Sequence, residues 1–260
     1  MEIAIFLHRP VPLTLSNRRF LHLLLLGLAA LTACAGGLPD HCDGLPANTP
    51  PADRNVLGCS PEVNIPDDLP YQAWELRFAH PPYMEIWIEN SQVLDIDNRL
   101  LPRAGGGTIS FGDLGDVDAA GWLNESGKPP YGAGRALTGL NLPKRLYVRW
   151  QSLVEPQTYK ALFDFPAWAR EKMVEPIQVD CVFGGQKTDY RRWVTLGLAP
   201  GGTVKVWIRN PCSEAIEIMT VQAQVVKEGP YLGKAEQYVT ATPEAKAHVE
   251  KHGIPYESWK

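Results

Sequence analysis

A strictly alternating stretch in the middle of the chain constrains the fold most. Residues 142–166 are LPKRLYVRWQSLVEPQTYKALFDFP. On both sides of the central Glu-Pro-Gln every second residue is apolar: Leu146, Val148 and Trp150 before it, then Tyr159, Ala161, Phe163 and Phe165 after it. Because successive side chains of a strand point to opposite faces, this pattern predicts a β-hairpin with one face in a core.

Five further segments carry the alternation of a half-buried strand. They are residues 71–78, 84–90, 189–198, 203–210 and 215–226. Two short helices are expected as well, at residues 166–174 and at 242–252, the second with Thr242 as its cap and Gly253 as its stop. The pattern predicts a mainly β fold, an antiparallel sheet or a β-sandwich with two short helices, one of them C-terminal.

Residues 99–142 are rich in glycine and are expected to form a long surface loop. A glycine-rich loop that holds a phosphate follows a strand and opens a helix, and neither GxGxxG nor GxxxxGK occurs here. Trp122 and Tyr131 are candidates for a partner-binding surface, unless they pack back onto the sheet. The turn around Gly201 is a third candidate.

The N-terminal region predicts export and lipidation. Two arginines precede an apolar run that ends in Leu31-Thr32-Ala33-Cys34, which resembles the lipobox of bacterial lipoproteins. We therefore expect a signal peptide over residues 1–33 and acylation of Cys34. A membrane span needs roughly 20 apolar residues and is disfavoured, because the run is shorter and contains His22; a plain cleavable signal is the other alternative. Ala35 after the cysteine favours an anchor in the outer membrane, facing the periplasm.

Residues 34–70 hold seven prolines and are expected to be a tether, with the folded domain over residues 71–260. Besides Cys34 there are four cysteines, which in an oxidising compartment imply two disulfides with three possible pairings. We expect the two local pairs, Cys42 with Cys59 and Cys181 with Cys212. The cysteine spacing does not match a zinc site, so we expect no metal.

Composition and motifs argue against several functions. The chain has 25 Lys+Arg against 29 Asp+Glu, net charge −4, so it offers no basic field for nucleic acid. It contains no GxSxG nucleophile motif, and His248 with His252 lacks the glutamate that a zinc hydrolase would place directly after the first histidine. We expect no enzyme activity and no cofactor.

Three strings carry a family resemblance: residues 142–166, residues 193–212 and the ending EAKAHVEKHGIPYESW. With them the chain resembles the bacterial lipoproteins grouped as domain of unknown function 2931. Such proteins tend to be encoded beside type VI secretion effectors, especially antibacterial phospholipases. The resemblance implies an immunity protein that binds a secreted effector, and it brings no catalytic residues. The alternative is a structural or accessory lipoprotein that binds another envelope component.

Overall fold

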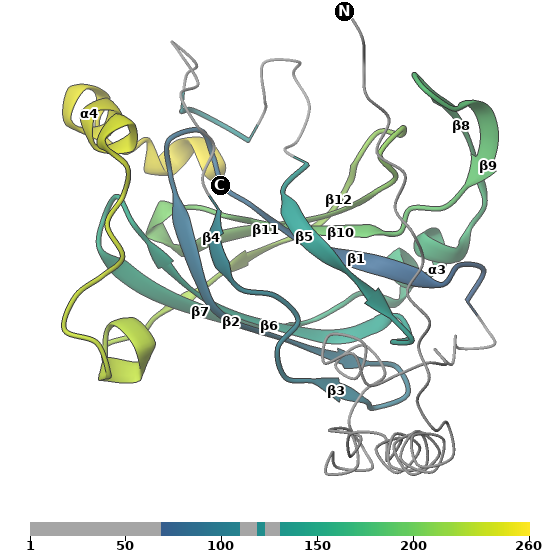
Figure 1. The fold of residues 1–260 in the computed structure, drawn as a ribbon, viewed down its shortest axis with the longest axis horizontal. Helices are drawn as coiled ribbons and strands as arrows, with labels where there is room; N and C mark the ends of the chain where they lie inside the picture. Colours follow the sequence, from purple (N-terminus) through teal and green to yellow (C-terminus); the bar gives the residue numbers. More distant parts are fainter. Residues whose placement is uncertain (1–68, 110–118, 123–130) are drawn as a thin grey trace, which may run out of the picture. The chain divides into compact units, whose positions relative to one another are not determined.

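The computed structural model describes residues 69–109, 119–122 and 131–260, which form a mainly β fold (Figure 1). The helices and strands are β1 Ala73–Ala79, β2 Ile86–Asp95, β3 Leu100–Leu101, β4 Gly107–Ile109, β5 Ala133–Thr138, β6 Pro143–Ser152, β7 Gln157–Asp164, α3 Ala167–Val174, β8 Ile177–Cys181, β9 Gly185–Asp189, β10 Trp193–Leu198, β11 Thr203–Arg209, β12 Ile216–Gln222, β13 Gln224–Val225 and α4 Pro243–His252. Three 3₁₀ turns are η1 Pro200–Gly202, η2 Pro230–Gly233 and η3 Tyr256–Trp259.

Two larger sheets and one small sheet hold these strands. The first sheet has the order β12-β11-β10-β1-β5, and its β1 and β10 run parallel while the other neighbours run antiparallel. The second has the order β13-β7-β6-β2-β3, with β4 also paired to β2, and is antiparallel. The small sheet is the β8–β9 hairpin.

The two larger sheets share one hydrophobic core. Trp74, Leu76 and Phe78 face it from β1, and the predicted inward set of Leu146, Val148 and Trp150 faces it from β6. Two large apolar faces shielded from water in this way supply the main driving force for folding. The mainly β class and the central hairpin are thus confirmed, and the arrangement is a β-sandwich.

A second cluster covers the outer face of the first sheet. Trp207 from β11 packs edge-on against Trp122, with ring centroids 5.3 Å apart, and the indole of Trp122 donates to the carbonyl of Trp259 at 3.1 Å. Gly197 of β10 makes this contact possible, because a Cβ there would lie 2.5 Å from Trp122. The C-terminal α4, capped as predicted by the Thr242 side chain and ended by Gly253, belongs to the same cluster through Ala245.

The outer face of the second sheet carries a buried ion pair. Arg149 on β6 contacts Glu89 on β2, and their side chains are 4% and 3% exposed. Glu89 sits at a bulge in the β2–β6 register and also accepts from the Gln151 amide and from the backbone N–H of Tyr231. Further along, the backbone N–H of Val239 donates to Gln151. The chain after β13 is therefore held onto this sheet through its backbone.

Two sequence expectations are corrected and others fall outside the described residues. The glycine-rich region is not one loop, since β3, β4 and β5 pair with the sheets from within it. No strand was predicted over residues 177–188, yet with Asp189 they form the β8–β9 hairpin, and the strand expected from residue 189 begins only at Trp193. The signal peptide and nearly all of the tether precede residue 69 and lie outside the described part of the chain. Within that part, no helix is long and apolar enough to cross a membrane.

Candidate protein-interaction surface

The most exposed apolar side chains of the described residues lie at the turn of the β8–β9 hairpin. Val182 is 93% exposed and Phe183 103%. The N–H of Gly184 donates to the carbonyl of Cys181 at 3.0 Å, which closes a tight turn with these two residues at its central positions. We call Val182 and Phe183 the hairpin tip. An exposed phenyl ring gains free energy when a partner covers it.

A disulfide braces the tip. Cys181, the last residue of β8, is bonded to Cys212 in the β11–β12 loop, with the two Cα atoms 5.2 Å apart. This is one of the two pairings expected from the sequence. Val179 on the same hairpin face is buried, so that face lies on the rest of the domain while Asp180 between them is exposed.

Buried Asn210 links the end of β9 to the loop that carries Cys212. Its side chain is 0% exposed, and its amide donates to the carbonyl of Tyr190 just after β9 at 2.9 Å. Its side-chain oxygen accepts from the backbone N–H of Cys212 at 2.9 Å, which shapes the loop that presents the disulfide. Both ends of the hairpin are therefore tied to the loop after β11, and the tip is held in one position.

Aromatic rings and guanidinium groups gather beside this brace. We call the four residues the aromatic–arginine ladder: Arg77 of β1, Trp193 of β10, Arg209 of β11 and Tyr131 before β5. Each arginine lies over a ring at 4.1 Å, Arg77 over Trp193 and Arg209 over Tyr131, and the two rings meet edge-on. Cation–π contacts of this kind stabilise a fixed arrangement.

The ladder is continuous with the braced loop. The Tyr131 hydroxyl donates to the carbonyl of Pro211, next to Cys212, at 3.4 Å, and the ring of Tyr131 is 40% exposed. The backbone carbonyl of Tyr131 accepts from Arg77 at 2.9 Å. Tyr131, the disulfide and the hairpin tip thus form one surface. Tyrosine, tryptophan and arginine are the residue types that dominate the energy of protein interfaces.

The structure places the other predicted site residues elsewhere. Trp122 is 7% exposed and packs on Trp207, which is the alternative that the sequence left open for it; Gly197 leaves the space in which its indole packs back onto the sheet. Gly201 lies in η1, where its N–H donates to Glu155 and Tyr256 packs close by. Cys34, Cys42 and Cys59 lie outside the described residues.

Sequence reasoning missed the hairpin tip, although a clue is present. The turn is Val182-Phe183-Gly184, and turn positions are usually polar or glycine. Two apolar side chains directly after a cysteine and directly before two glycines could have marked an exposed apolar loop. Trp193 and Arg77 were missed because their neighbourhood depends on the parallel pairing of β1 with β10.

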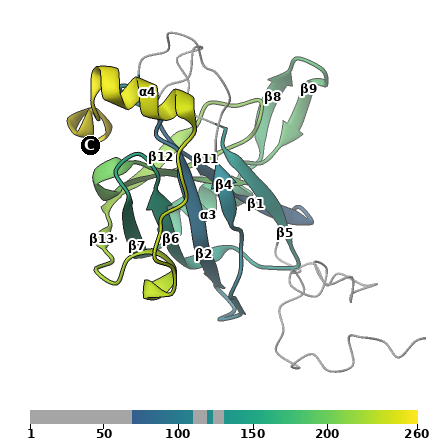
Figure 2. The same ribbon diagram turned by 60° about the vertical axis from the view of Figure 1, so that its left-hand side comes forward.

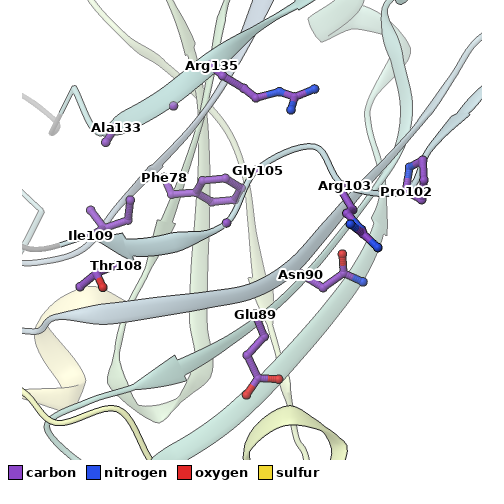
Figure 3. A pocket seen from close by; sticks show the side chains of 12 residues that line it. Phe78, Glu89, Asn90, Pro102, Arg103, Gly105, Thr108, Ile109, Ala133 and Arg135 are labelled. Atoms are coloured by element: carbon purple, nitrogen blue, oxygen red, sulfur yellow. The ribbon is translucent and has the colours of Figure 1, made fainter. Parts of the chain in front are cut away.

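A cavity of about 1030 Å³ opens between the edges of the two sheets (Figure 3). Phe78, Arg103 and Arg135 are among the residues that line it, together with the glycines before β4. Glu89 also contributes to the wall, but it points away from the other labelled side chains, toward Arg149. Ile109 in the wall is followed by residues outside the described chain, and we assign this cavity no ligand.

The three histidines of the described residues, His80, His248 and His252, form no catalytic arrangement. His248 on α4 stacks on Tyr83 with ring centroids 4.0 Å apart, whereas His252 is exposed. His80 is 2% exposed, and its Nδ1–H donates to the carbonyl of Pro81 at 2.7 Å. In the described ranges no group of three or more His, Cys, Asp or Glu could hold a metal ion.

The buried His80 predicts a pH dependence of stability. Burial lowers the pKa of its imidazole from 6.5 to about 4. Between these values the unfolded chain binds a proton that the folded protein does not, so stability is full above about pH 6.5 and falls as the pH drops. We expect His80 to make the free energy of unfolding about 2 kcal/mol lower at pH 5 than at pH 7.5.

Urea unfolding at several pH values measures this effect when it is compared with His80→Asn. The variant removes the titrating group, so its stability should fall less steeply between pH 7.5 and pH 5. Parallel pH profiles for the two proteins would show that His80 is not the group responsible.

Sandwich and surface together define a class: a mainly β protein that presents an apolar, disulfide-braced hairpin. The chain belongs to the family described as "Protein of unknown function (DUF2931)", whose sequence model matches residues 54–257. This confirms the family resemblance drawn from the three sequence strings. No curated protein and no solved structure matches the chain.

Proposed function

We propose that this protein is a lipid-anchored periplasmic immunity protein that binds and neutralises a secreted phospholipase-type effector of a type VI secretion system. The hairpin tip is the observation that carries the proposal, since Phe183 is fully exposed on a turn that a disulfide holds in place. The sequence resemblance supports the kind of partner. The role proposed for the protein is binding, with no catalysis and no cofactor.

Interface energetics support a binding role for this surface. Burying an exposed phenylalanine contributes roughly 1.5–3 kcal/mol, and a rigid loop loses little conformational entropy when it binds. The neighbouring Tyr131 and Trp193 add ring area that is already fixed by Arg77 and Arg209. A stable complex buries about 1,600 Å² in total, so the tip and the ladder would form its centre and the surrounding polar surface its rim.

The proposed anchor would place this surface where a phospholipase attacks. Two or more acyl chains on Cys34 would give stable membrane attachment, which a single chain does not. Net charge −4 gives no electrostatic attraction to anionic lipid, so the acyl chains would supply the membrane affinity. The proline-rich residues 34–70 would then set the distance between the membrane and the sandwich.

Survival of a sensitive bacterium tests the proposal. The product of the adjacent gene is directed to the periplasm, with and without this protein. We expect killing without it and rescue with it, and weaker rescue with Cys34→Ala if the anchor concentrates the protein at the membrane. Killing without rescue, or no killing, would contradict the immunity role and favour an accessory envelope lipoprotein.

A further inference from the structure

The hairpin tip is a narrow apolar projection. The β8–β9 hairpin stands off the two larger sheets in both views (Figure 2). Its two exposed apolar side chains are followed by Gly184 and Gly185, and no atom lies within 4 Å of where a Cβ of Gly185 would be. The turn is therefore narrow on one side and apolar on the other. A convex element of this kind fits a narrow apolar cleft better than a flat surface.

The small apolar area of the hairpin tip disfavours a membrane as the occupant. Asp180 and Asp189 outnumber Lys187, and the whole chain is acidic with net charge −4. Membrane-inserting segments combine a larger apolar area with basic residues that attract anionic lipid. The two residues of the hairpin tip alone provide little apolar area, although Arg191 and Arg192 follow β9 closely, so a protein cleft is the better match.

Resting on the proposed function, we infer that the hairpin tip enters the acyl-chain cleft of the effector and excludes phospholipid from it. An enzyme that cleaves phospholipids must hold acyl chains in an apolar channel that opens to solvent. The isopropyl group of Val182 and the ring of Phe183 offer this channel the same chemistry as a lipid tail. The disulfide to Cys212 keeps the tip extended toward the cleft, and Tyr131 contacts the rim.

Competition between the tip and a lipid analogue tests the inference. The dissociation constant of the complex with the effector is measured for the chain carrying Cys34→Ala, which lacks the proposed lipid. The competitor is an ether-linked phosphatidylcholine with two six-carbon chains, used below its micelle concentration. We expect it to raise the apparent dissociation constant in proportion to its concentration. Glycerophosphocholine has the same polar group without the chains and should have no effect.

Two variants distinguish the contribution of the hairpin tip to binding from that of exposed apolar side chains elsewhere. Phe183→Ala should weaken binding about 30-fold, the size of an interface hot spot. Leu162→Ala removes an apolar side chain that is 62% exposed on β7, away from the hairpin, and should leave the affinity unchanged.

The outcomes distinguish the inference from the function on which it rests. A complex whose affinity is unchanged at saturating ether lipid, or unchanged by Phe183→Ala, would overturn the cleft assignment and leave the immunity role standing. Absence of any complex, together with absence of rescue, would overturn the immunity role itself. Binding to phosphatidylethanolamine–phosphatidylglycerol vesicles that is lost with Phe183→Ala would assign the tip to the membrane instead.

Discussion

Replacing Arg149 with methionine is expected to lower the free energy of unfolding by about 3–5 kcal/mol. The change leaves the carboxylate of Glu89 buried without its cation, because Arg149 and Glu89 are 4% and 3% exposed. It also removes the hydrogen bond from Arg149 to the carbonyl of Gly229 at 2.7 Å. Urea unfolding at pH 7, followed by tryptophan fluorescence, measures the loss.

Arg145→Met is the matched control. Arg145 lies on the same strand and pairs with Asp164, but their side chains are 47% and 69% exposed. Exposed ion pairs contribute little to stability, so this variant should unfold almost as the native protein does. Adding Glu89→Gln to Arg149→Met should recover part of the lost stability, because it removes the uncompensated charge. Equal destabilisation by the two arginine variants would contradict the special role of the buried pair.

Loss of the Cys181–Cys212 disulfide is the second large effect that we expect. The two cysteines are 31 residues apart in sequence, and the chain-entropy estimate for a loop of that length is roughly 3–4 kcal/mol. The double variant Cys181→Ser with Cys212→Ser should be less stable by about this amount. Urea unfolding of the variant and the native protein, both without reductant, gives the difference.

The cysteine variants also test whether the hairpin needs the disulfide to stay in place. Single replacement of either cysteine leaves one free thiol and should be as destabilising as the double change, since each removes the same bond. A double variant that keeps the native stability would show that Asn210 and the buried Val179 hold the hairpin without the disulfide.

Local pattern predicted those elements whose side chains alternate between core and solvent. Leu146, Val148 and Trp150 on β6 lie in the core as expected, and Thr242 caps α4. β5 escaped prediction because it contributes mainly backbone to the edge of the first sheet: of its side chains only that of Leu137 is buried. A strand defined by pairing, with little apolar alternation, leaves no periodic pattern in the sequence.

The interaction surface could be predicted less well than the fold. Tyr131 was identified from its type and its glycine-rich surroundings, and it does lie beside the braced loop. Trp122 had the same sequence context and is buried, because Gly197 on a distant strand leaves room for its indole. Side chains brought together by pairing between remote strands, such as Arg77 with Trp193, cannot be placed from local spacing.

Residues Arg149 to Leu153, RWQSL, lie within one of the three strings that carry the family resemblance, and the structure gives three of them a role. Trp150 fills the core, Arg149 pairs with Glu89, and Gln151 bonds both Glu89 and the backbone of Val239. The string joins the second sheet to the chain that crosses it. The β2 bulge that brings Glu89 onto this face is the part that no periodicity predicted.

The way in which this crossing chain is held has a consequence for its sequence. Its N–H groups at Tyr231 and Val239 donate to Glu89 and Gln151, so these two attachments use the backbone, whereas Thr242 binds Glu85 through both its N–H and its hydroxyl. Most side chains at Tyr231 and Val239 would preserve these backbone bonds, whereas proline, which has no N–H, would break them. Leu232, 62% exposed, can change to another residue that tolerates its φ of 60° while these backbone bonds remain. The sequence of the chain that crosses the second sheet can therefore vary at such positions with little loss of stability.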